Sequence, residues 1–216
     1  AELAAVPAKV SVTSIVHKAE QTTLERPGFL SKDGLTAAEM GTALHAFLEH
    51  ADFARLAKAK AAGTLDAAIP AERDRQVALQ LTAPEIAEKL DVSRIRRFVE
   101  SEAFAKICAA DEVLRELAFI TALPAEAVLA AQGTEGVRAE GEQVLVQGIA
   151  DLVLVYPDHL ELLDYKTDRR KTEADFLHAY RAQLNLYALA IDKRFAPKKV
   201  TYKGIYSLEL GKLIEV

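Results

Sequence analysis

The sequence contains a single cysteine, Cys108, and this scarcity excludes several kinds of site. One thiol cannot form an intramolecular disulfide, a four-cysteine zinc site or a cysteine-ligated iron–sulfur cluster. We expect Cys108 to be a small buried hydrophobic residue on a helix. A single cysteine is also consistent with a reducing, cytoplasmic setting. The sequence therefore predicts a protein with no iron–sulfur cluster.

Long apolar segments are lacking as well. No run of about eighteen apolar residues occurs, so neither a membrane span nor a membrane partner is expected. The N-terminus, AELAAVPAKV, has no basic region before an apolar block and is not a signal peptide. It has no initiator Met, and no G-x-x-x-x-G-K-[ST] loop is present. We therefore expect a fragment of a longer chain, without an ATP site of its own.

Composition predicts a globular protein, because half of the 216 residues are hydrophobic. The formal net charge of −5 argues weakly against nucleic-acid binding. The basic residues are nevertheless clustered. Such clusters are often solvated faces, but they can also form a positive rim around an acidic site. They comprise Arg94, Arg96 and Arg97; Lys166, Arg169, Arg170 and Lys171; and Lys193, Arg194, Lys198 and Lys199.

Hydrophobic periodicity predicts helices before Val113 and mainly strands after it. Thr36 and Glu39 form a capping box at the start of a helix over 36–60, and Gly63 marks its end. A second capping box, Thr172 with Asp175, begins a helix over 172–193. Further predicted helices cover 71–80, 84–90 and 93–109. Predicted strands cover 8–16, 113–121, 143–156 and 160–167, with two closing strands in 200–216.

The order of these elements predicts a mixed α/β domain. Residues 1–35 are interpreted as an N-terminal linker with a short extended segment, since Pro27, Gly28 and Gly34 interrupt any regular pattern. Residues 36–216 are interpreted as one domain with a central mixed sheet flanked by helices. Within it, 66–110 is expected to be a helical insertion, and Pro124 and 133–141 are expected to be loop.

The hairpin over 148–167 carries the chemistry. Strands joined by a four-residue loop, 156–159, would place residues opposite one another when their numbers sum to 315. Asp151 would then lie directly opposite Asp164, with Cβ atoms about 4.5–5.5 Å apart. Lys166 would share the face of Asp164. An odd-length loop would instead put the two aspartates on opposite faces.

Two carboxylates that face each other in an apolar hairpin repel, and each resists losing its hydration. A divalent cation removes both penalties, and Mg²⁺ prefers such hard oxygen ligands. Lys166 could then hold a phosphate oxygen or orient the attacking water. The alternative is an ordinary cross-strand ion pair between Asp151 and Lys166 on an exposed face.

Four segments resemble the RecB-like branch of the PD-(D/E)XK nucleases, and more narrowly the C-terminal nuclease domain of AddA-type helicase–nucleases. The segment LRELAF at 114–119 and the closing YSLELGKLIEV also fit. The resemblance implies a restriction-endonuclease-like PD-(D/E)XK core, and the absence of further cysteines agrees with the AddA side of the family. The four segments are GTALHAFLEH (41–50), VQGIADLVLV (146–155), LLDYKTDR (162–169) and YRAQLNLYALAI (180–191).

The resemblance assigns a role to each matching residue. It implies that the metal ligands are His45, Asp151, Asp164 and the backbone carbonyl of Tyr165, with Lys166 as the catalytic lysine. Taken without the other segments, a histidine on an Ala/Leu helix is more often a packed core residue. Residues that would support the site or contact DNA are Glu49, Glu116, Gln183 and Tyr187, the last two of which could alternatively be a capped polar pair in the core.

The implied activity is Mg²⁺-dependent hydrolysis of DNA phosphodiesters, with Mn²⁺ as a possible substitute. The resemblance also implies an exonuclease that processes double-strand break ends for recombinational repair in the bacterial cytoplasm, at the nucleoid. Its substrate would be a single strand from an unwound duplex end. Helicase domains would lie upstream in the same chain, and an AddB-type subunit would be the partner. Two alternatives remain: a nuclease-silent module that docks DNA or a partner protein, and a stand-alone structure-specific nuclease.

Overall fold

The computed structural model describes residues 9–11, 37–134, 139 and 141–216, and these residues form a mixed α/β domain. The predicted linker at 25–34 and the predicted helix cap at Thr36 lie outside these residues, as does most of the extended segment predicted at 8–16. The strands of the described part are β1 (Lys9–Ser11), β2 (Glu112–Pro124), β3 (Gln143–Val155), β4 (Leu160–Lys166), β5 (Val200–Ser207) and β6 (Lys212–Glu215).

One six-stranded mixed sheet contains all of these strands. Strand β3 is its centre, because β2 pairs antiparallel with β3 along its whole length while β1 and β4 pair with different parts of β3. The order then continues through β5, which is parallel to β4, to β6, which is antiparallel to β5. Gly211 adopts a φ of +66° in the turn before β6, as the predicted pair of closing strands requires.

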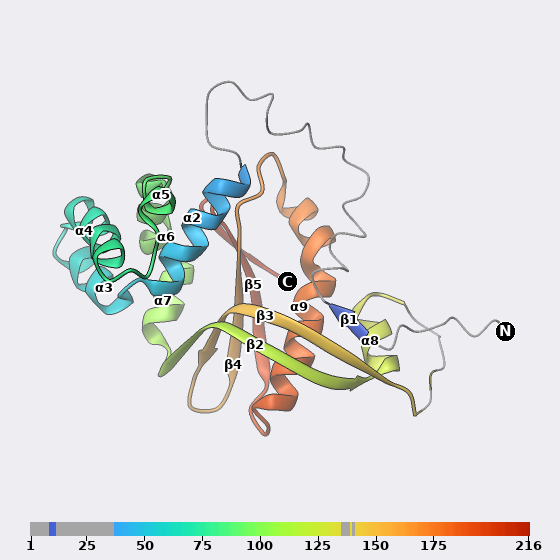
Figure 1. Cartoon of the computed structure of the whole chain (residues 1–216). Coiled ribbons are helices and arrows are strands. Elements are labelled where there is room, and N and C mark those ends of the chain that lie inside the picture. The colour runs from blue at the N-terminus through green and yellow to red at the C-terminus, as the bar shows by residue number, and fades with distance from the viewer. Residues whose placement is uncertain (1–8, 12–36, 135–138, 140) are drawn as a thin grey trace.

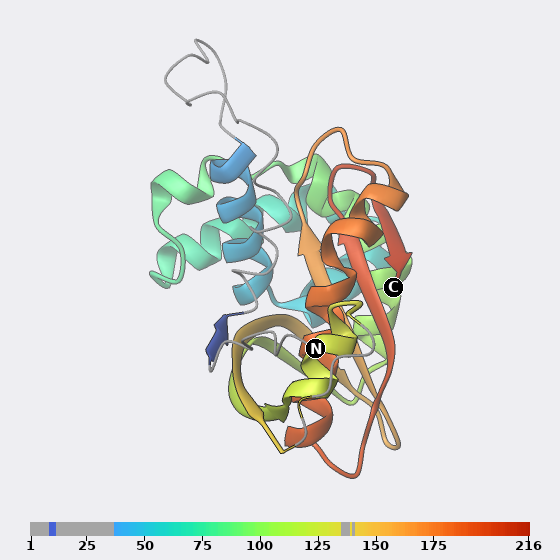
Figure 2. The same ribbon diagram turned by 90° about the vertical axis from the view of Figure 1, so that its right-hand side faces the viewer.

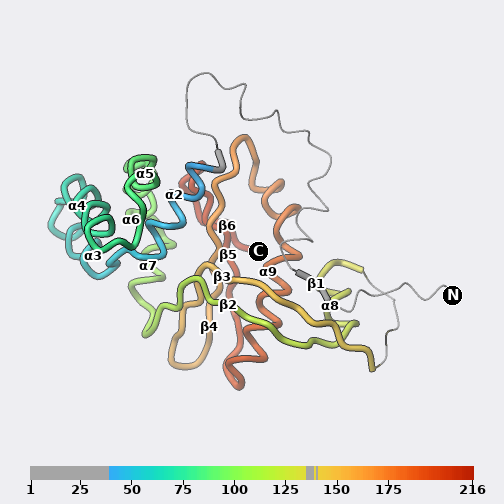
Figure 3. Tube along the Cα trace, viewed as in Figure 1, coloured from blue at the N-terminus to red at the C-terminus, as the bar shows by residue number. Residues whose placement is uncertain are grey.

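Helices cover both faces of the sheet, so the domain has three layers (Figures 1 and 2). Helix α9 packs on one face over β2, β3, β4 and β5. The helices α2 to α7 gather on the other side, as the chain trace in Figure 3 also shows. The helices are α2 (Ala37–His50), α3 (Phe53–Ala61), α4 (Leu65–Ala78), α5 (Pro84–Ala87), α6 (Val92–Glu100), α7 (Glu102–Ala109), α8 (Ala125–Ala131) and α9 (Glu173–Arg194).

Two hydrophobic clusters hold these layers together. The cluster under α9 contains Phe176, Leu184 and Ile191 with sheet residues such as Val146. The cluster on the other face joins α2, α3, α6 and α7 to the far ends of β3, β4 and β5. The alternation of side chains along β3 and β4 supplies both clusters, because neighbouring residues of a strand point to opposite faces. This confirms the predicted central sheet flanked by helices.

Several predicted boundaries are wrong. The predicted helix over 36–60 is two helices, because the side chain of Asp52 accepts a hydrogen bond from the Arg55 N–H and starts α3 anew. The helix predicted over 93–109 is likewise divided where Ser101 caps α7. The stretch after Pro124, predicted as loop, begins with α8, whose buried Val128 packs in the cluster under α9.

The prediction for Cys108 is also wrong, because this residue is exposed rather than buried. Its neighbours on α7, Phe104 and Ile107, face the core, whereas Cys108 follows Ile107 by one residue and points away from it. Among the described helices, none combines the length and the apolar character that crossing a bilayer requires.

Candidate functional site

The hairpin register matches the prediction. Strands β3 and β4 pair from Val155 with Leu160 to Leu152 with Leu163, and each pair of numbers sums to 315. The turn is closed by a hydrogen bond from the Tyr156 N–H to the His159 carbonyl at 3.1 Å. The next position along the two strands joins Asp151 to Asp164. These two aspartates therefore stand opposite each other, one step beyond the end of the backbone ladder.

Strand β2 brings a third acidic residue to the same place. Arg115 pairs with Leu152 and Leu117 with Ala150, so Glu116 lies opposite Asp151 although the ladder omits this pair. Glu116 has a φ of +45°, which is a left-handed conformation that non-glycine residues rarely adopt. Such conformations cluster at functional sites, where the surrounding structure enforces them.

The buried faces of β3 exchange at this same position. Ala150 packs in the cluster under α9, whereas Leu152 packs in the cluster with α2. Residues two apart on a regular strand share a face, so the strand must turn sharply at Asp151. The turn leaves Asp151 half-buried beside the sheet rather than inside either cluster.

Helix α2 supplies the histidine of the site. His45 Nδ1 lies 3.8 Å from Asp151 Oδ2 and 4.0 Å from Glu116 Oε1. One ligand atom from each of these three residues lies within 4.8 Å of the others, which is a spacing that could hold a metal ion. The structure therefore brings the predicted His45 and Asp151 together and adds Glu116, which the sequence had suggested only as a supporting residue.

The approach of α2 to the sheet depends on a glycine. A Cβ atom on Gly41 would lie 2.9 Å from the Thr167 hydroxyl oxygen, a distance too short for real contacts. Gly41 and Thr167 belong to two of the segments on which the family resemblance rests. The absence of a side chain at Gly41 thus lets α2 pack against the residue that follows Lys166.

Burial and neighbouring charge shift the pKa values of this cluster. Burial, together with the negative charge of Asp164, raises the pKa of Asp151 to about 7. Burial lowers the pKa of His45, but the hydrogen bond with Glu116 and the charges of Asp151 and Asp164 outweigh it, so the net pKa is raised. A cluster that resists full ionisation of its acids favours a cation.

Asp164 and Lys166 form a buried ion pair. Lys166 Nζ lies 2.5 Å from Asp164 Oδ2, and the aspartate side chain is only 2% exposed. On the other oxygen, Asp164 Oδ1 accepts a hydrogen bond from Gln183 Nε2 at 3.4 Å. Burial lowers the pKa of Lys166, but the charges of Asp164 and Asp151 more than offset this, so its pKa is raised and the ammonium is retained.

Helix α9 lines the lysine side of the site. Gln183 also donates to the Tyr187 hydroxyl at 3.0 Å, so the predicted pair joins Asp164 one helical turn apart. Tyr180, which the sequence had not suggested, places its ring 4.6 Å from Lys166 Nζ. Its hydroxyl donates to both oxygens of Asp168 at 2.8 and 2.9 Å. The spacing of Tyr180, Gln183 and Tyr187 along one helix face was the available signal.

The two remaining predicted residues differ in placement. The Tyr165 N–H donates to Asp151 Oδ2 at 2.8 Å, so it faces β3. Because the N–H and C=O of one strand residue share an edge, the Tyr165 carbonyl points the same way. Glu49 is directed elsewhere, with its carboxylate 3.8 Å from His50 Nε2. Glu49 lies outside the three-residue cluster, and its supporting role stays a prediction.

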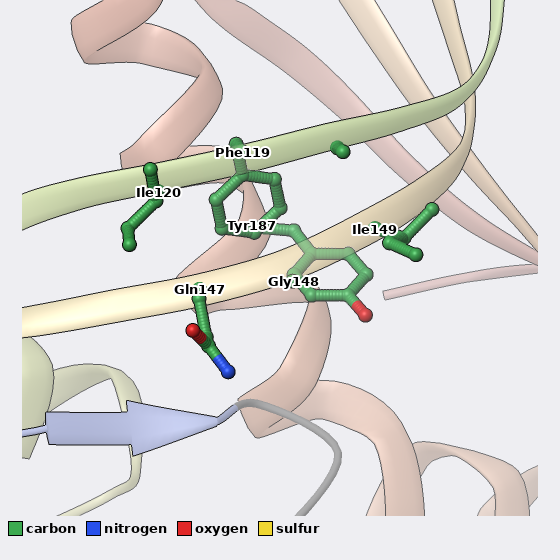
Figure 4. A pocket seen from close by; sticks show the side chains of 7 residues that line it. Phe119, Ile120, Gln147, Gly148, Ile149 and Tyr187 are labelled. Atoms are coloured by element: carbon green, nitrogen blue, oxygen red, sulfur yellow. The ribbon is translucent and has the colours of Figure 1, made fainter.

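An apolar groove of about 520 Å³ borders the site. Figure 4 shows Ile120 and Ile149 at its rim and the rings of Phe119 and Tyr187 beside Gly148. A Cβ on Gly148 would lie 2.8 Å from an atom of each ring. Ile149 precedes Asp151 by two residues, and Tyr187 reaches Asp164 through Gln183, so the groove adjoins the acidic cluster.

Comparison with known families agrees with this arrangement. The sequence profile of the PD-(D/E)XK nuclease superfamily matches residues 18–212, which is most of the chain and includes the described site. The chain belongs to the PD-(D/E)XK nuclease superfamily. The expectation drawn from the four sequence segments is thereby confirmed.

Individual relatives point to one kind of protein within this superfamily. The following are all AddA-type chains, each named as an ATP-dependent helicase/nuclease, which confirms the narrower resemblance. That of Heliobacterium modesticaldum is 36% identical over 87% of this chain. Those of Moorella thermoacetica and Acetivibrio thermocellus are 35% and 31% identical, each over 97% of this chain. The chain spans only 13% to 17% of the length of these relatives.

Proposed function

We propose that this domain is the nuclease of an AddA-type helicase–nuclease, hydrolysing DNA phosphodiesters with a divalent cation. The observation that carries the proposal is the convergence of His45, Glu116 and Asp151, from three separate elements, beside the ion pair of Asp164 with Lys166. Membership in the PD-(D/E)XK superfamily supports the same chemistry.

The residues present fit a hard divalent cation. Carboxylate oxygens are the ligands that Mg²⁺ and Mn²⁺ prefer, and an imidazole is compatible with Mn²⁺. The raised pKa of Asp151 shows that the carboxylates crowd one another when no cation balances them. We propose His45, Asp151, Asp164 and the Tyr165 carbonyl as ligands, with Glu116 as a further acidic ligand.

When bound, the cation would activate water and stabilise the negative charge that develops on the phosphate. The residues of the chain do the positioning. Lys166 retains its proton and presents an ammonium to a phosphate oxygen, at the edge of the cluster where Asp164 holds it. Gln183 fixes the orientation of Asp164 through its hydrogen bond, and Tyr187 in turn fixes Gln183.

The proposed substrate is a single DNA strand, delivered by helicase domains of the same polypeptide, with an AddB-type protein as the second subunit. The support is the likeness to chains whose names include both a helicase and a nuclease and which are much longer than this domain. The whole assembly would process double-strand break ends in the bacterial cytoplasm. Glu49 is retained as a support of the helix that carries His45.

A digestion assay tests the proposal. Single-stranded DNA is incubated with Mg²⁺ or Mn²⁺ and the wild-type chain, Asp164→Ala or Lys166→Ala, with Lys212→Ala as the control. Lys212 lies in an exposed ion pair with Glu173, far along the sequence from the site. We expect cleavage by the wild type and the control only. Equal cleavage by all four proteins would remove the mechanism.

No cleavage by any of the four proteins would favour a nuclease-silent docking module. Binding then separates the two functions, because a docking module binds DNA without needing Asp164. If Asp164→Ala and the wild type bound a single-stranded oligonucleotide equally, with and without Mn²⁺, and Mn²⁺ itself did not bind the wild type, the domain would be assigned to docking.

A further inference from the structure

The end of helix α2 is held by side chains from outside the helix. The last carbonyls of a helix have no partner within it, so they need donors from elsewhere. Here each carbonyl from Phe47 to Ala51 accepts a hydrogen bond from a side chain of β2 or α4. The donors are Gln76 for Phe47, Arg115 for Leu48, Glu49 and Ala51, and Arg75 for His50.

Arg115 makes the largest share of these contacts. Its Nη1 atom lies 2.7 Å from the Ala51 carbonyl oxygen, 2.9 Å from that of Glu49 and 3.5 Å from that of Leu48. Its guanidinium carbon lies 3.9 Å from the centre of the Phe53 ring, which holds the group in place. A cation at this end of a helix also interacts favourably with the helix dipole.

Arg115 is the residue before Glu116 on β2, and its contacts are one turn beyond His45 on α2. A single guanidinium therefore ties the helix that carries the histidine to the strand that carries the glutamate. The site itself has no direct tether of this kind, since His45 is 3.8 Å from Asp151 and 4.0 Å from Glu116.

A buried cluster on α4 holds the same helix end from the other side. Glu72 is fully buried and accepts hydrogen bonds from the Asp52 N–H at 3.0 Å and from Arg75 at 2.5 and 2.8 Å. Arg75 in turn reaches the His50 carbonyl at 2.9 Å. Breaking a buried ion pair is costly, so this arrangement resists movement of the helix end.

We propose that Arg115 is a positioning residue, which sets His45 against Asp151 and Glu116 by fixing the end of α2 to β2, with Arg75 as its counterpart on α4. The inference rests on the proposed function, because it takes His45 as a metal ligand. It gives helix α4 a part in forming the metal site, although no residue of α4 belongs to the cluster.

The test measures Mn²⁺ affinity by electron paramagnetic resonance, which needs no DNA cleavage. Arg115→Ala and Arg115→Lys are compared with Arg194→Ala, with circular dichroism as the check on folding. Arg194 is a matched control, because its guanidinium also donates to a carbonyl of β2, that of Ala118 at 2.8 Å, but does not hold α2. We expect Arg115→Ala to weaken binding about tenfold. Arg115→Lys should weaken it less, and Arg194→Ala should leave it unchanged.

A double-mutant cycle separates positioning from a general loss of structure. If Arg115 acts through His45, then Arg115→Ala causes no further weakening in a His45→Ala background. Equal weakening in both backgrounds, or unchanged affinity in Arg115→Ala, would overturn the inference alone. Should Arg115→Ala fail to fold, Arg115→Lys and Arg75→Ala are put through the same cycle. Unchanged Mn²⁺ affinity in His45→Ala itself would instead overturn the ligand set of the proposed function, and the inference with it.

Discussion

The Asp151 carboxylate accepts a hydrogen bond from the Tyr165 backbone N–H at 2.8 Å. The backbone ladder between β3 and β4 ends one step earlier, at Leu152 and Leu163. A side chain thus replaces the backbone carbonyl that would otherwise continue the ladder. This contact fixes one oxygen of Asp151 and directs the carboxylate toward His45, so the end of the ladder and the position of the acid have the same cause.

Replacing Asp151 should separate its structural role from its charge. In Asp151→Asn the amide oxygen can still accept from Tyr165, so we expect stability close to or above that of the wild type, because a buried charge is removed. Asp151→Ala leaves the Tyr165 N–H without this partner, which costs about 1–3 kcal/mol. Both variants should lose Mn²⁺ binding. Urea unfolding and Mn²⁺ titration measure the two effects, and an Asp151→Asn variant that retained Mn²⁺ affinity would contradict the assignment.

The affinity for Mn²⁺ should depend on pH through Asp151. Its pKa is raised to about 7, so below pH 7 the cation must displace a proton from this carboxyl. The apparent affinity should therefore rise by up to about tenfold per pH unit below 7 and become less steep above it. Mn²⁺ titrations at a series of pH values measure this slope, and an affinity that stayed constant through the acidic range would count against it.

The same shift predicts how the metal-free domain responds to pH. A folded-state pKa above the unfolded value means that the native state binds more protons between about pH 4 and pH 7. The contribution of Asp151 to stability is thus present below the unfolded pKa and is lost as pH rises through about 7. Chemical unfolding of the metal-free wild type and of Asp151→Asn measures this, and a difference between them that did not change with pH would contradict it.

Removing Lys166 should make the domain depend more on its cation for stability. Lys166→Ala leaves the buried Asp164 carboxylate without its ion-pair partner, which costs on the order of 3–5 kcal/mol without metal. Mn²⁺ can then take over the freed oxygen, so the rise in melting temperature on adding Mn²⁺ should exceed that of the wild type. The exposed Lys212→Ala serves as the control. An equal rise in all three proteins would show that Lys166 and the cation do not share Asp164.

Gly148→Ala should disturb the packing between the groove and α9. The added Cβ would lie 2.8 Å from both Phe119 Cζ and Tyr187 Cε1, and such overpacking costs about 1–3 kcal/mol. Displacement of Tyr187 would also weaken its contact with Gln183. Urea unfolding measures the loss, and adding Phe119→Leu, which removes one of the two clashing ring atoms, should restore part of it. A Gly148→Ala variant as stable as the wild type would contradict this packing.

Much of the site was predictable because it depends on local geometry. The length of the Tyr156–His159 turn determines the register, and the register places Asp151 opposite Asp164. The side-chain period of two then puts Lys166 beside Asp164. The position of His45, by contrast, came from the family resemblance, since helix periodicity alone could not place α2 against the sheet.

The features that escaped prediction depend on contacts between distant segments. Nothing local indicates that Glu116 adopts a positive φ, because the twist of β2 against β3 imposes it. The interruption of the first helix at Asp52 is coupled to Glu72, twenty residues away in sequence. Arg115 likewise resembles an ordinary strand residue until α2 is placed beside it.

The central claim is tested most directly by a crystal structure of this chain soaked in Mn²⁺, with data collected at a wavelength that reveals manganese by anomalous scattering. The account predicts a peak within coordination distance of His45, Asp151 and Asp164, and its absence in a His45→Ala crystal. A peak that avoids these residues, or an empty cluster at saturating Mn²⁺, would contradict it.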